Sequence, residues 1–579
     1  MTYQAPVAQM LRLARQLGHD RLAQTERFAE ATAETRAAVL AEAAKLAETV
    51  IAPLNRPGDL HGARLENGVV RLPPGFVEGY RAMAEGGWVG LSADAEHGGM
   101  GLPHSVGVMV GEMMASGCLS LSLCPLLSQG QIEALQRHGA PWMKALYLPK
   151  LTSGDWSGTM NLTEPQAGTD VGALRSKAVP AEDGTYRITG EKIWISWGDH
   201  DAVENVVHLV LARLPDAPAG SRGISLFLVP KFLPDADGRP GVANQLKVVS
   251  LEHKMGLHAS PTCVMAFEGA TGWLVGEEHR GLACMFTMMN HARLGVGVEG
   301  VGVAEAALQA AVAWATARVQ GRTDDGSPTI IGHADVRRML AEMAAETRVA
   351  RALCYDCAVS LDLAHAADTA EERAAEERRG ALLTPIAKAF ATDTGIAVAN
   401  TAIQVHGGMG YCEEAGVAQY LRDARITAIY EGTNGVQAAD LVGRKLTGDG
   451  GATMQALLAA AGRTAEAAAA AGRQAEAVAL AAAVSKAEGV TRWMLEAEAR
   501  DRAAGATPYL RLIAMTLGGH YLVQAALESA DEEEAAAEET AALARLWCAR
   551  RLPEVHALAQ AVCAGSADLF ALTPETLAG

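Results

Sequence analysis

A carboxylate set between an aromatic ring and a glycine is the feature of this sequence best suited to chemistry. Glu431 lies between Tyr430 and Gly432 in an otherwise apolar, helix-rich region. Partial desolvation beside a ring raises the pKa of a carboxylate toward the range useful for taking a proton from carbon, and a glycine lets a substrate approach the backbone. The alternative is a glutamate that caps a helix near Thr433 and Asn434. We therefore expect either a general base or a helix cap at this position.

A second polar segment lies far upstream. Residues 160–170 read Met-Asn-Leu-Thr-Glu-Pro-Gln-Ala-Gly-Thr-Asp, and residues 192–196 read Lys-Ile-Trp-Ile-Ser. Taken alone, the first segment could be a strand that ends in a Thr-Glu-Pro turn. Together with the segment around Glu431, in this order and at this spacing, it resembles the acyl-CoA dehydrogenase family. The resemblance extends from about Trp88 to Leu446.

The resemblance implies a reaction in which flavin adenine dinucleotide (FAD) oxidises an acyl-CoA thioester to the trans-2-enoyl-CoA. An α-proton next to a thioester is a very weak acid, so the developing enolate must be stabilised while a base is positioned. Glu431 matches the catalytic base of the family. Its backbone N–H and a flavin hydroxyl would hold the thioester oxygen, Tyr430 would form a wall of the substrate cavity, and Gly432 would let the substrate come close.

The resemblance also assigns residues to the flavin. Leu162 and Thr163 match positions that face the isoalloxazine ring, and Trp194 and Ser196 match the positions at its other polar edge. Thr169 stands where the family usually has serine, and its hydroxyl keeps the capacity to contact the flavin phosphate or CoA.

Further positions correspond to the adenine end of the flavin and to the substrate. Arg318 matches an arginine that binds the flavin pyrophosphate of a neighbouring subunit, although Gln320-Gly321 replaces the usual Phe-Gly; the alternative is an arginine on a helix surface. The turn at 404–410 matches a glycine-rich turn that approaches the flavin across a dimer, and otherwise it simply ends a helix. The flavin and substrate positions in this part of the chain are Gln404, Gly407 and Gly408 in that turn, Thr433 and Gln437 near the adenine, and Arg293 near the substrate and CoA, with Asn290 where short members often have aspartate.

The elements that must position these residues fall into four parts. Helical periodicity predicts an α domain at 1–155, short β-branched runs predict a β domain at 156–280, and long helical periodicity returns in an α bundle at 281–450. An alanine-rich extra helical domain follows at 451–579. The expected fold class is α+β, mostly α, with the acyl-CoA dehydrogenase fold and a C-terminal extension.

Two short motifs in the sequence do not predict cofactor sites. Residues 295–300 read Gly-Val-Gly-Val-Glu-Gly, but no strand precedes them, so we interpret these glycines as a place where two helices approach closely and not as a dinucleotide fingerprint. Cys354 and Cys357 form the only Cys-x-x-Cys pair, in a helical run without a second pair, and we expect buried thiols there. We expect no metal site.

Composition restricts the partners. The chain has 579 residues and a formal net charge of −18, which argues against nucleic acid and against an anionic membrane surface. Nine cysteines without framework spacing fit a reducing compartment. No signal peptide and no segment long enough to span a membrane is expected, which favours a cytoplasmic protein. The sequence at 531–534, Asp-Glu-Glu-Glu, predicts an exposed acidic turn.

The extension and the local sequences at 208–213, 224–231 and 288–294 resemble a longer subgroup that includes bacterial methylmercaptopropionyl-CoA dehydrogenases and fatty acyl-CoA enzymes. The family implies an acyl-CoA substrate, electron-transfer flavoprotein as the electron acceptor, and a homodimer. Two alternatives remain at this point. One is an acyl-CoA oxidase of the same fold, and the other is a non-catalytic DNA-binding flavoprotein, which the acidic C-terminal part disfavours.

Overall fold

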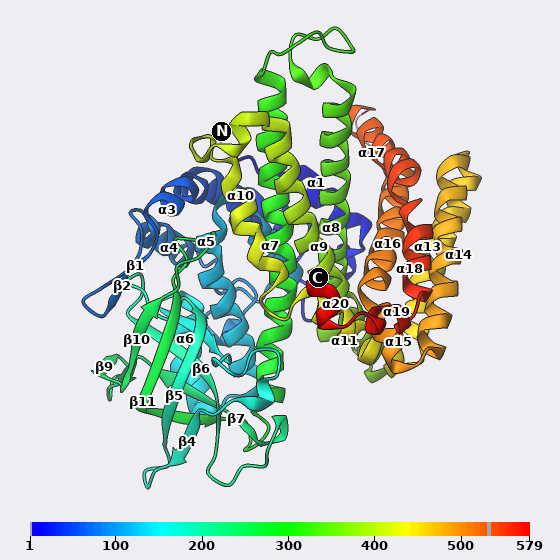
Figure 1. The fold of residues 1–579 in the computed structure, drawn as a ribbon. Helices are drawn as coiled ribbons and strands as arrows, with labels where there is room; N and C mark the ends of the chain where they lie inside the picture. The colour runs from blue at the N-terminus through cyan, green and yellow to red at the C-terminus, as the bar shows by residue number, and fades with distance from the viewer. Residues whose placement is uncertain (1–2, 530–533) are drawn as a thin grey trace. The chain divides into compact units, whose positions relative to one another are not determined.

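The computed structural model describes residues 3–529 and 534–579, and the chain forms two compact units. The 38–295 unit consists of residues 3–5 and 38–295, and the 296–579 unit consists of residues 6–37 and the described part of 296–579. Figure 1 labels the helices and strands of both units. Helices α2 (Ala33–Leu46) and α7 (Gly281–Ala317) contribute to both units.

A closed circuit of strands forms the middle of the 38–295 unit. Strand β11 pairs with β5, β5 with β4, β4 with β6, β6 with β7, and β7 again with β11. Strands β3 and β10 extend this circuit by pairing with β6 and β11. The seven strands are β3 (Trp156–Asn161), β4 (Lys177–Pro180), β5 (Tyr186–Ser196), β6 (Asn205–Arg213), β7 (Ile224–Pro230), β10 (Leu246–Leu251) and β11 (Thr262–Val275). The predicted β domain is therefore present.

Strands β6 and β7 lie at the centre of this sheet. Every residue of β7 is buried, and so is every residue of β6 except Arg213, as expected for strands covered on both faces. Val210 and Phe227 belong to the apolar core enclosed by the circuit. A second ribbon of β8 (Phe232–Pro234) and β9 (Pro240–Ala243) follows directly after β7.

The helices of this unit are α3 (Asn55–His61), α4 (Phe76–Glu85), α5 (His104–His138) and α6 (Pro141–Ser153). Helix α5 packs on β3, where Ser128 Oγ accepts a hydrogen bond of 3.0 Å from the Gly158 N–H. The expectation of a purely helical first part is wrong at one place. Strands β1 (Arg64–Glu66) and β2 (Val69–Arg71) form a hairpin whose turn residues Asn67 and Gly68 both have positive φ. An Asn-Gly turn of this kind is the strongest short hairpin signal in a sequence.

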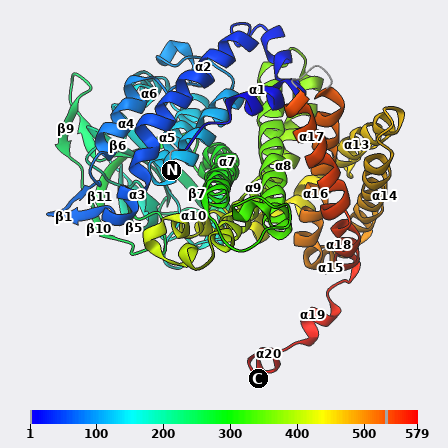
Figure 2. The same ribbon diagram turned by 90° about the horizontal axis from the view of Figure 1, so that it is seen from above.

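The 296–579 unit is helical. Its long helices are the C-terminal part of α7, α8 (Ala334–Ala366) and α9 (Ala370–His406), with α10 (Val417–Ala424) and α11 (Asn434–Asp440) beside them. The remaining α-helices are α1 (Val7–Gln16), α12 (Leu446–Gly448), α13 (Ala452–Ala470), α14 (Gln474–Glu496), α15 (Ala499–Ala504), α16 (Ala506–Glu528), α17 (Glu534–Leu546), α18 (Glu554–Cys563), α19 (Ala567–Ala571) and α20 (Pro574–Ala578). Figure 2 shows α13, α14, α16 and α18 side by side, with α19 and α20 extending away from them. The predicted acidic turn falls almost entirely on residues 530–533, outside the described residues.

The glycines of the rejected dinucleotide motif lie inside α7, not after a strand. A Cβ added at Gly300 would stand 2.4 Å from the Ala391 carbonyl oxygen of α9, and one at Gly297 would stand 3.3 Å from the Lys388 Cα. Such separations leave no room for a side chain at Gly300. The interpretation of these glycines as a close helix contact is confirmed.

A buried polar network joins α16 of the C-terminal extension to α8 and α9. Asp356 Oδ2 on α8 accepts hydrogen bonds from the Tyr521 hydroxyl at 2.6 Å and from Arg379 Nη2 at 2.7 Å.

All nine cysteines are free, and both members of the Cys-x-x-Cys pair are buried, as expected.

Two described helices, α5 and α7, are long and apolar enough to cross a membrane by length and composition alone. The expectation that no segment reaches that length is therefore wrong. Within the protein, 89% of the apolar window in α5 and 72% of that in α7 is buried. These windows are core helices, which share their length and composition with membrane spans.

Candidate active site

The loop between α10 and α11 presents Glu431 on an unusual backbone. Glu431 has φ of 56° and Gly432 has φ of 85°, so both are in the left-handed region. A residue with a side chain rarely adopts this conformation, which costs on the order of 1–3 kcal/mol and persists only where the surroundings enforce it. Glycine is the residue that tolerates it at the second position. The half-buried Glu431 is thus held in a defined orientation.

Two side chains enforce the conformation of this loop. Gln437 Nε2 donates to the carbonyl oxygens of Glu431 at 3.1 Å and Gly432 at 3.3 Å. Lys388 Nζ on α9 donates to the Gly432 carbonyl oxygen and to Asn434 Oδ1, both at 3.0 Å. The helix cap that was the alternative role for Glu431 belongs to Thr433, whose side chain accepts a hydrogen bond from the Val436 N–H of α11.

Thr433 and Gln437 were expected near the adenine of a flavin, and both are used within their own loop in this structure. Lys388 was not found from the sequence, although a single lysine at the centre of the apolar run 386–391 is a detectable signal for a buried cation with a dedicated partner.

Tyr430 connects this loop to α7. Its hydroxyl donates a hydrogen bond to Glu299 Oε2, while Glu299 is only 3% exposed. Burial raises the pKa of Glu299 to about 8; the Tyr430 hydrogen bond lowers it in part, and the nearby Glu431 charge raises it. Burial, and after it the carboxyl group of Glu299, also raises the pKa of Tyr430 well above its usual value. Glu299 was overlooked in the sequence because it lies inside the glycine motif.

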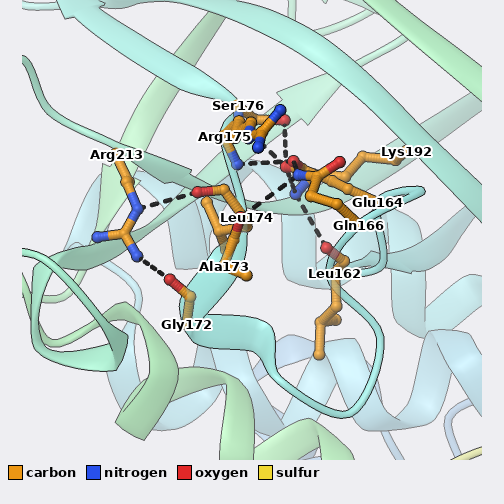
Figure 3. Close-up of polar contacts among 10 residues, drawn as sticks. All are labelled: Leu162, Glu164, Gln166, Gly172, Ala173, Leu174, Arg175, Ser176, Lys192 and Arg213. Carbon is orange, nitrogen blue, oxygen red and sulfur yellow. Dashed lines mark hydrogen bonds and ion pairs between the residues drawn. The ribbon is translucent and has the colours of Figure 1, made fainter.

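A second polar cluster lies in the 38–295 unit at the turn after β3 (Figure 3). Glu164 Oε1 accepts from Lys192 Nζ at 2.8 Å, from Ser176 Oγ at 2.6 Å and from the Ser176 N–H at 3.0 Å. Its Oε2 accepts from the Arg175 N–H at 2.6 Å and from Gln166 Nε2 at 2.7 Å. The Lys192 ammonium also donates to the Leu162 carbonyl oxygen at 3.0 Å.

The charges of this cluster are stabilised by one another. Burial opposes ionisation of Glu164, but the Lys192 ammonium and the donors from Ser176 and Arg175 outweigh it and lower the pKa of Glu164 to about 2. Burial lowers the pKa of Lys192 to about 8 against the attraction of Glu164. A buried charge needs such a partner and such hydrogen bonds. Neither residue was assigned a role from the sequence, although both lie in the quoted segments.

These contacts fix the segment expected to face a flavin ring. The Leu162 carbonyl is held by Lys192, and the Thr163 carbonyl oxygen accepts a hydrogen bond of 2.9 Å from the Ile193 N–H of β5. Trp194 lies at a bulge of β5 opposite β11, has φ of 59° and is 61% exposed. A bulge re-aims a side chain, here a large aromatic ring that solvent can reach. Ser196 pairs with Thr262 at the end of β5, and Thr169 is exposed in the turn.

A third group of expected residues lies together at the end of α7 and of α9. The Trp314 ring stacks on His406 at 4.9 Å between centroids, and the exposed Arg318 guanidinium lies 6.0 Å from the same indole. Gln404, Gly407 and Gly408 are exposed beside His406, and nothing lies within 4 Å of a Cβ position at either glycine. The open backbone here can accept a ligand group.

Arg293 is 8% exposed and lies on α7 in the 38–295 unit. Its Nη1 donates to Asn290 Oδ1 at 3.2 Å, and its guanidinium lies 5.9 Å from the Phe286 ring centre. No group of three or more histidine, cysteine or acidic side chains among the described residues could hold a metal ion.

Comparison with known proteins identifies the family of each part of the chain. The sequence matches the N-terminal domain of acyl-CoA dehydrogenases over residues 32–155, their middle domain over 159–270 and their C-terminal domain over 279–447. Residues 452–573 match a domain described as acetyl-CoA dehydrogenase C-terminal like. The predicted fold class, with its additional C-terminal domain, is confirmed.

One relative is 3-methylmercaptopropionyl-CoA dehydrogenase of Ruegeria pomeroyi, which is 50% identical over 458 residues, 78% of each chain. The structure of Caenorhabditis elegans ACDH-11 in complex with C11-CoA matches with a TM-score of 0.79 at 22% identity, over 95% of this chain and 92% of that one. An acyl-CoA dehydrogenase of Bacillus anthracis complexed with FAD matches with a TM-score of 0.73 at 19% identity, over 93% and 90%. The two structures show the fold. The domain matches, together with the identity to the Ruegeria relative, show that this chain belongs to the acyl-CoA dehydrogenase family, whose members are oxidoreductases acting on the CH–CH bond of acyl-CoA.

Proposed function

We propose that this chain oxidises 3-methylmercaptopropionyl-CoA to the corresponding trans-2-enoyl-CoA, with FAD as its cofactor and Glu431 as its base. The observation that carries the proposal is the left-handed backbone at Glu431, held by Gln437 and Lys388 inside a family whose reaction needs one positioned base. The identity of 50% to the Ruegeria enzyme supports the thioether substrate over a plain fatty acyl chain.

The residues present fit FAD. The exposed Trp194 ring at a strand bulge and the fixed carbonyls of Leu162 and Thr163 offer a surface for a flat ring. The open backbone at Gly407 and Gly408, next to the exposed Arg318, suits a diphosphate, because a guanidinium matches phosphate oxygens and glycine allows close approach. Thr169, Ser196 and Gln404 are proposed as further contacts.

The chain's own groups divide the work as follows. Glu431 takes the α-proton, and its backbone N–H donates to the thioester oxygen as negative charge develops there. Bound FAD supplies the acceptor for the β-hydrogen and its electron pair. Tyr430 and Gly432 line the substrate beside the base, and Arg293 is proposed to lie near the CoA. We propose that the left-handed backbone at Glu431 presents both its side chain and its N–H to one substrate.

The test is anaerobic loss of the visible flavin absorbance on addition of acyl-CoA. The panel is methylmercaptopropionyl-CoA, butyryl-CoA, octanoyl-CoA and palmitoyl-CoA, and we expect the first to bleach the flavin fastest. Glu431→Gln should bind flavin normally and lose more than about 1,000-fold of the reduction rate, because the amide accepts no proton. Near-normal reduction by this variant would remove Glu431 from its role, and faster bleaching by a fatty acyl-CoA would replace the substrate.

We propose a homodimer in which Arg318 and the 404–408 turn of one subunit complete the flavin site of the other. Mixed dimers of Glu431→Gln and Arg318→Ala subunits give a sharp test. If Arg318 acts in the partner's site, each mixed dimer holds one doubly damaged site and one intact site, so mixing restores activity. If Arg318 acts within its own subunit, both sites are damaged and no activity returns.

Electron-transfer flavoprotein is proposed as the electron acceptor and the cytoplasm as the location. Reoxidation of the reduced enzyme by electron-transfer flavoprotein at least about tenfold faster than by dissolved oxygen supports a dehydrogenase. The opposite ranking supports the oxidase.

A further inference from the structure

Glu299 is a buried acid on α7 that the reaction outlined above does not use. It contacts the loop between α10 and α11 directly, because its Oε2 accepts the hydrogen bond from Tyr430, the residue before Glu431. Its Oε1 is buried without a hydrogen-bond partner among the described residues. A carboxylate with one unsolvated and unpaired oxygen is costly, and a proton is the simplest way to remove that charge.

The position of Glu299 is fixed by the packing of two helices. It stands between Gly297 and Gly300, where α7 and α9 approach at backbone distance. Lys388 lies on the facing stretch of α9 and attracts Glu299 electrostatically while its ammonium donates to the Gly432 carbonyl oxygen and to Asn434. The contact between α7 and α9 therefore places the acidic Glu299 and the basic Lys388 against the loop that carries Glu431.

We propose that Glu299 and Glu431 act as a coupled pair of acids joined through Tyr430, in which Glu299 holds a proton at neutral pH and sets the basicity of Glu431. This inference rests on the proposed function of Glu431. Glu299 is a positioning residue, because it touches Tyr430 and acts on the base through charge. Interacting acids of this kind titrate as a pair.

The surrounding charges are consistent with one proton on the pair. The ionisable groups that act on Glu299 are Tyr430 and Glu431 on the loop and Lys388 on α9, with Asp423 of α10 acting on Tyr430 and Asp393 of α9 bonded to Asn434. Lys388 is the one cation among these groups, and the others, Glu431, Tyr430, Asp423 and Asp393, are acids. Burial raises the pKa of Glu299 to about 8, so the proton is present at pH 7 and leaves as the pH rises through that value.

Loss of this proton has a definite consequence for the chemistry. A negative Glu299 repels the negative Glu431, which increases the proton affinity of Glu431 and favours removal of the α-proton. A rise of one unit in the pKa of Glu431 increases its proton affinity tenfold. The rate of α-proton removal should then increase by between about threefold and tenfold. The rate of flavin reduction by acyl-CoA should therefore rise by that factor through pH 8.

The experiment compares the pH dependence of flavin reduction in the wild-type enzyme, Glu299→Gln and Tyr430→Phe, with excess acyl-CoA in the absence of oxygen. Glutamine keeps an acceptor for Tyr430 and has no proton to lose, so the rise near pH 8 should vanish. Phenylalanine removes the hydrogen bond that favours the charged form of Glu299, so the rise should move to higher pH. A rise of the same size and position in Glu299→Gln would overturn the proposal.

A second measurement does not depend on turnover. Infrared difference spectra of the resting enzyme between pH 7 and pH 9.5 should contain the loss of a carboxylic acid C=O band in wild type that Glu299→Gln lacks. If no acyl-CoA bleaches the flavin and this band is still present, the proposed function fails and Glu299 retains its proton. If bleaching is normal but the band is identical in both proteins, the coupled pair is wrong and the proposed function stands.

Discussion

Replacing Lys192 by methionine should open the turn expected to face the flavin ring. The change removes an ammonium with no exposed surface that lies 2.8 Å from Glu164 Oε1, and it leaves a carboxylate that is 4% exposed. Removing one partner of a buried ion pair costs about 3–5 kcal/mol. We take the lower end, about 3 kcal/mol, because hydrogen bonds from Ser176, Arg175 and Gln166 to the carboxylate remain.

Amide hydrogen exchange measures the local free energy of opening at this turn. A local measurement suits a protein of two units, because one global free energy of unfolding is poorly defined for it. The Arg175 and Ser176 amides, which donate to Glu164, should exchange roughly 100-fold faster in Lys192→Met, since about 1.4 kcal/mol is tenfold. Lys247→Met is the matched control. It breaks an ion pair of 2.7 Å to Glu268 in the same unit, but both side chains are about 60% exposed, so the cost should stay below about 1 kcal/mol.

The comparison has a clear failing outcome. Equal exchange of the two amides in Lys192→Met and in wild type would mean that the buried pair does not hold the turn, and the argument for its role would be wrong. Faster exchange accompanied by weaker flavin retention in Lys192→Met, with neither change in Lys247→Met, would connect the pair to the cofactor surface.

Three further predictions follow from other contacts. Gly300→Ala should destabilise the contact between α7 and α9 by about 1–3 kcal/mol, because the new Cβ meets the Ala391 carbonyl, and the amides of these helices should exchange faster; Gly443→Ala, with open space around it, should leave this exchange unchanged or slower. The pKa of Glu164 is lowered to about 2, so its stabilisation is complete above about pH 5 and is lost as the pH falls toward 2, which hydrogen exchange at acid pH can follow. Tyr521→Phe removes the hydroxyl bound to Asp356 and should cost about 1–3 kcal/mol of stability in the helices of the 296–579 unit, measured by the same exchange method.

The sequence was sufficient for the parts of the fold that have strong local signals. The runs at 206–211 and 224–229 are apolar except for His208 and Ser225, and they form the buried strands β6 and β7. The hairpin at 64–71 was missed although its Asn-Gly turn is a clear local signal, because the surrounding helical pattern dominated the interpretation.

The site could be predicted less completely, for a physical reason. Glu431 was proposed as the base from its neighbours together with the family resemblance, but the residues that contact its loop are distant: Lys388 precedes it by 43 positions and Glu299 by 132. Such contacts depend on how α7 and α9 pack, and no local pattern encodes them. The left-handed backbone at Glu431 and at Trp194 could not be read from residue type, because neither is a residue that prefers it.

The network of Asp356, Arg379 and Tyr521 bears on the modularity of the chain. Truncation before residue 451 would remove Tyr521, one of the two donors to the Asp356 carboxylate among the described residues, and would uncover an acid that is now 4% exposed. It would also remove Arg551 and Glu539, the ion-pair partners of Glu346 and Arg348 on α8. The extension is consequently not an appendage that truncation could discard to leave a shorter enzyme. The helices before it depend on the extension for partners to the side chains of Asp356, Glu346 and Arg348.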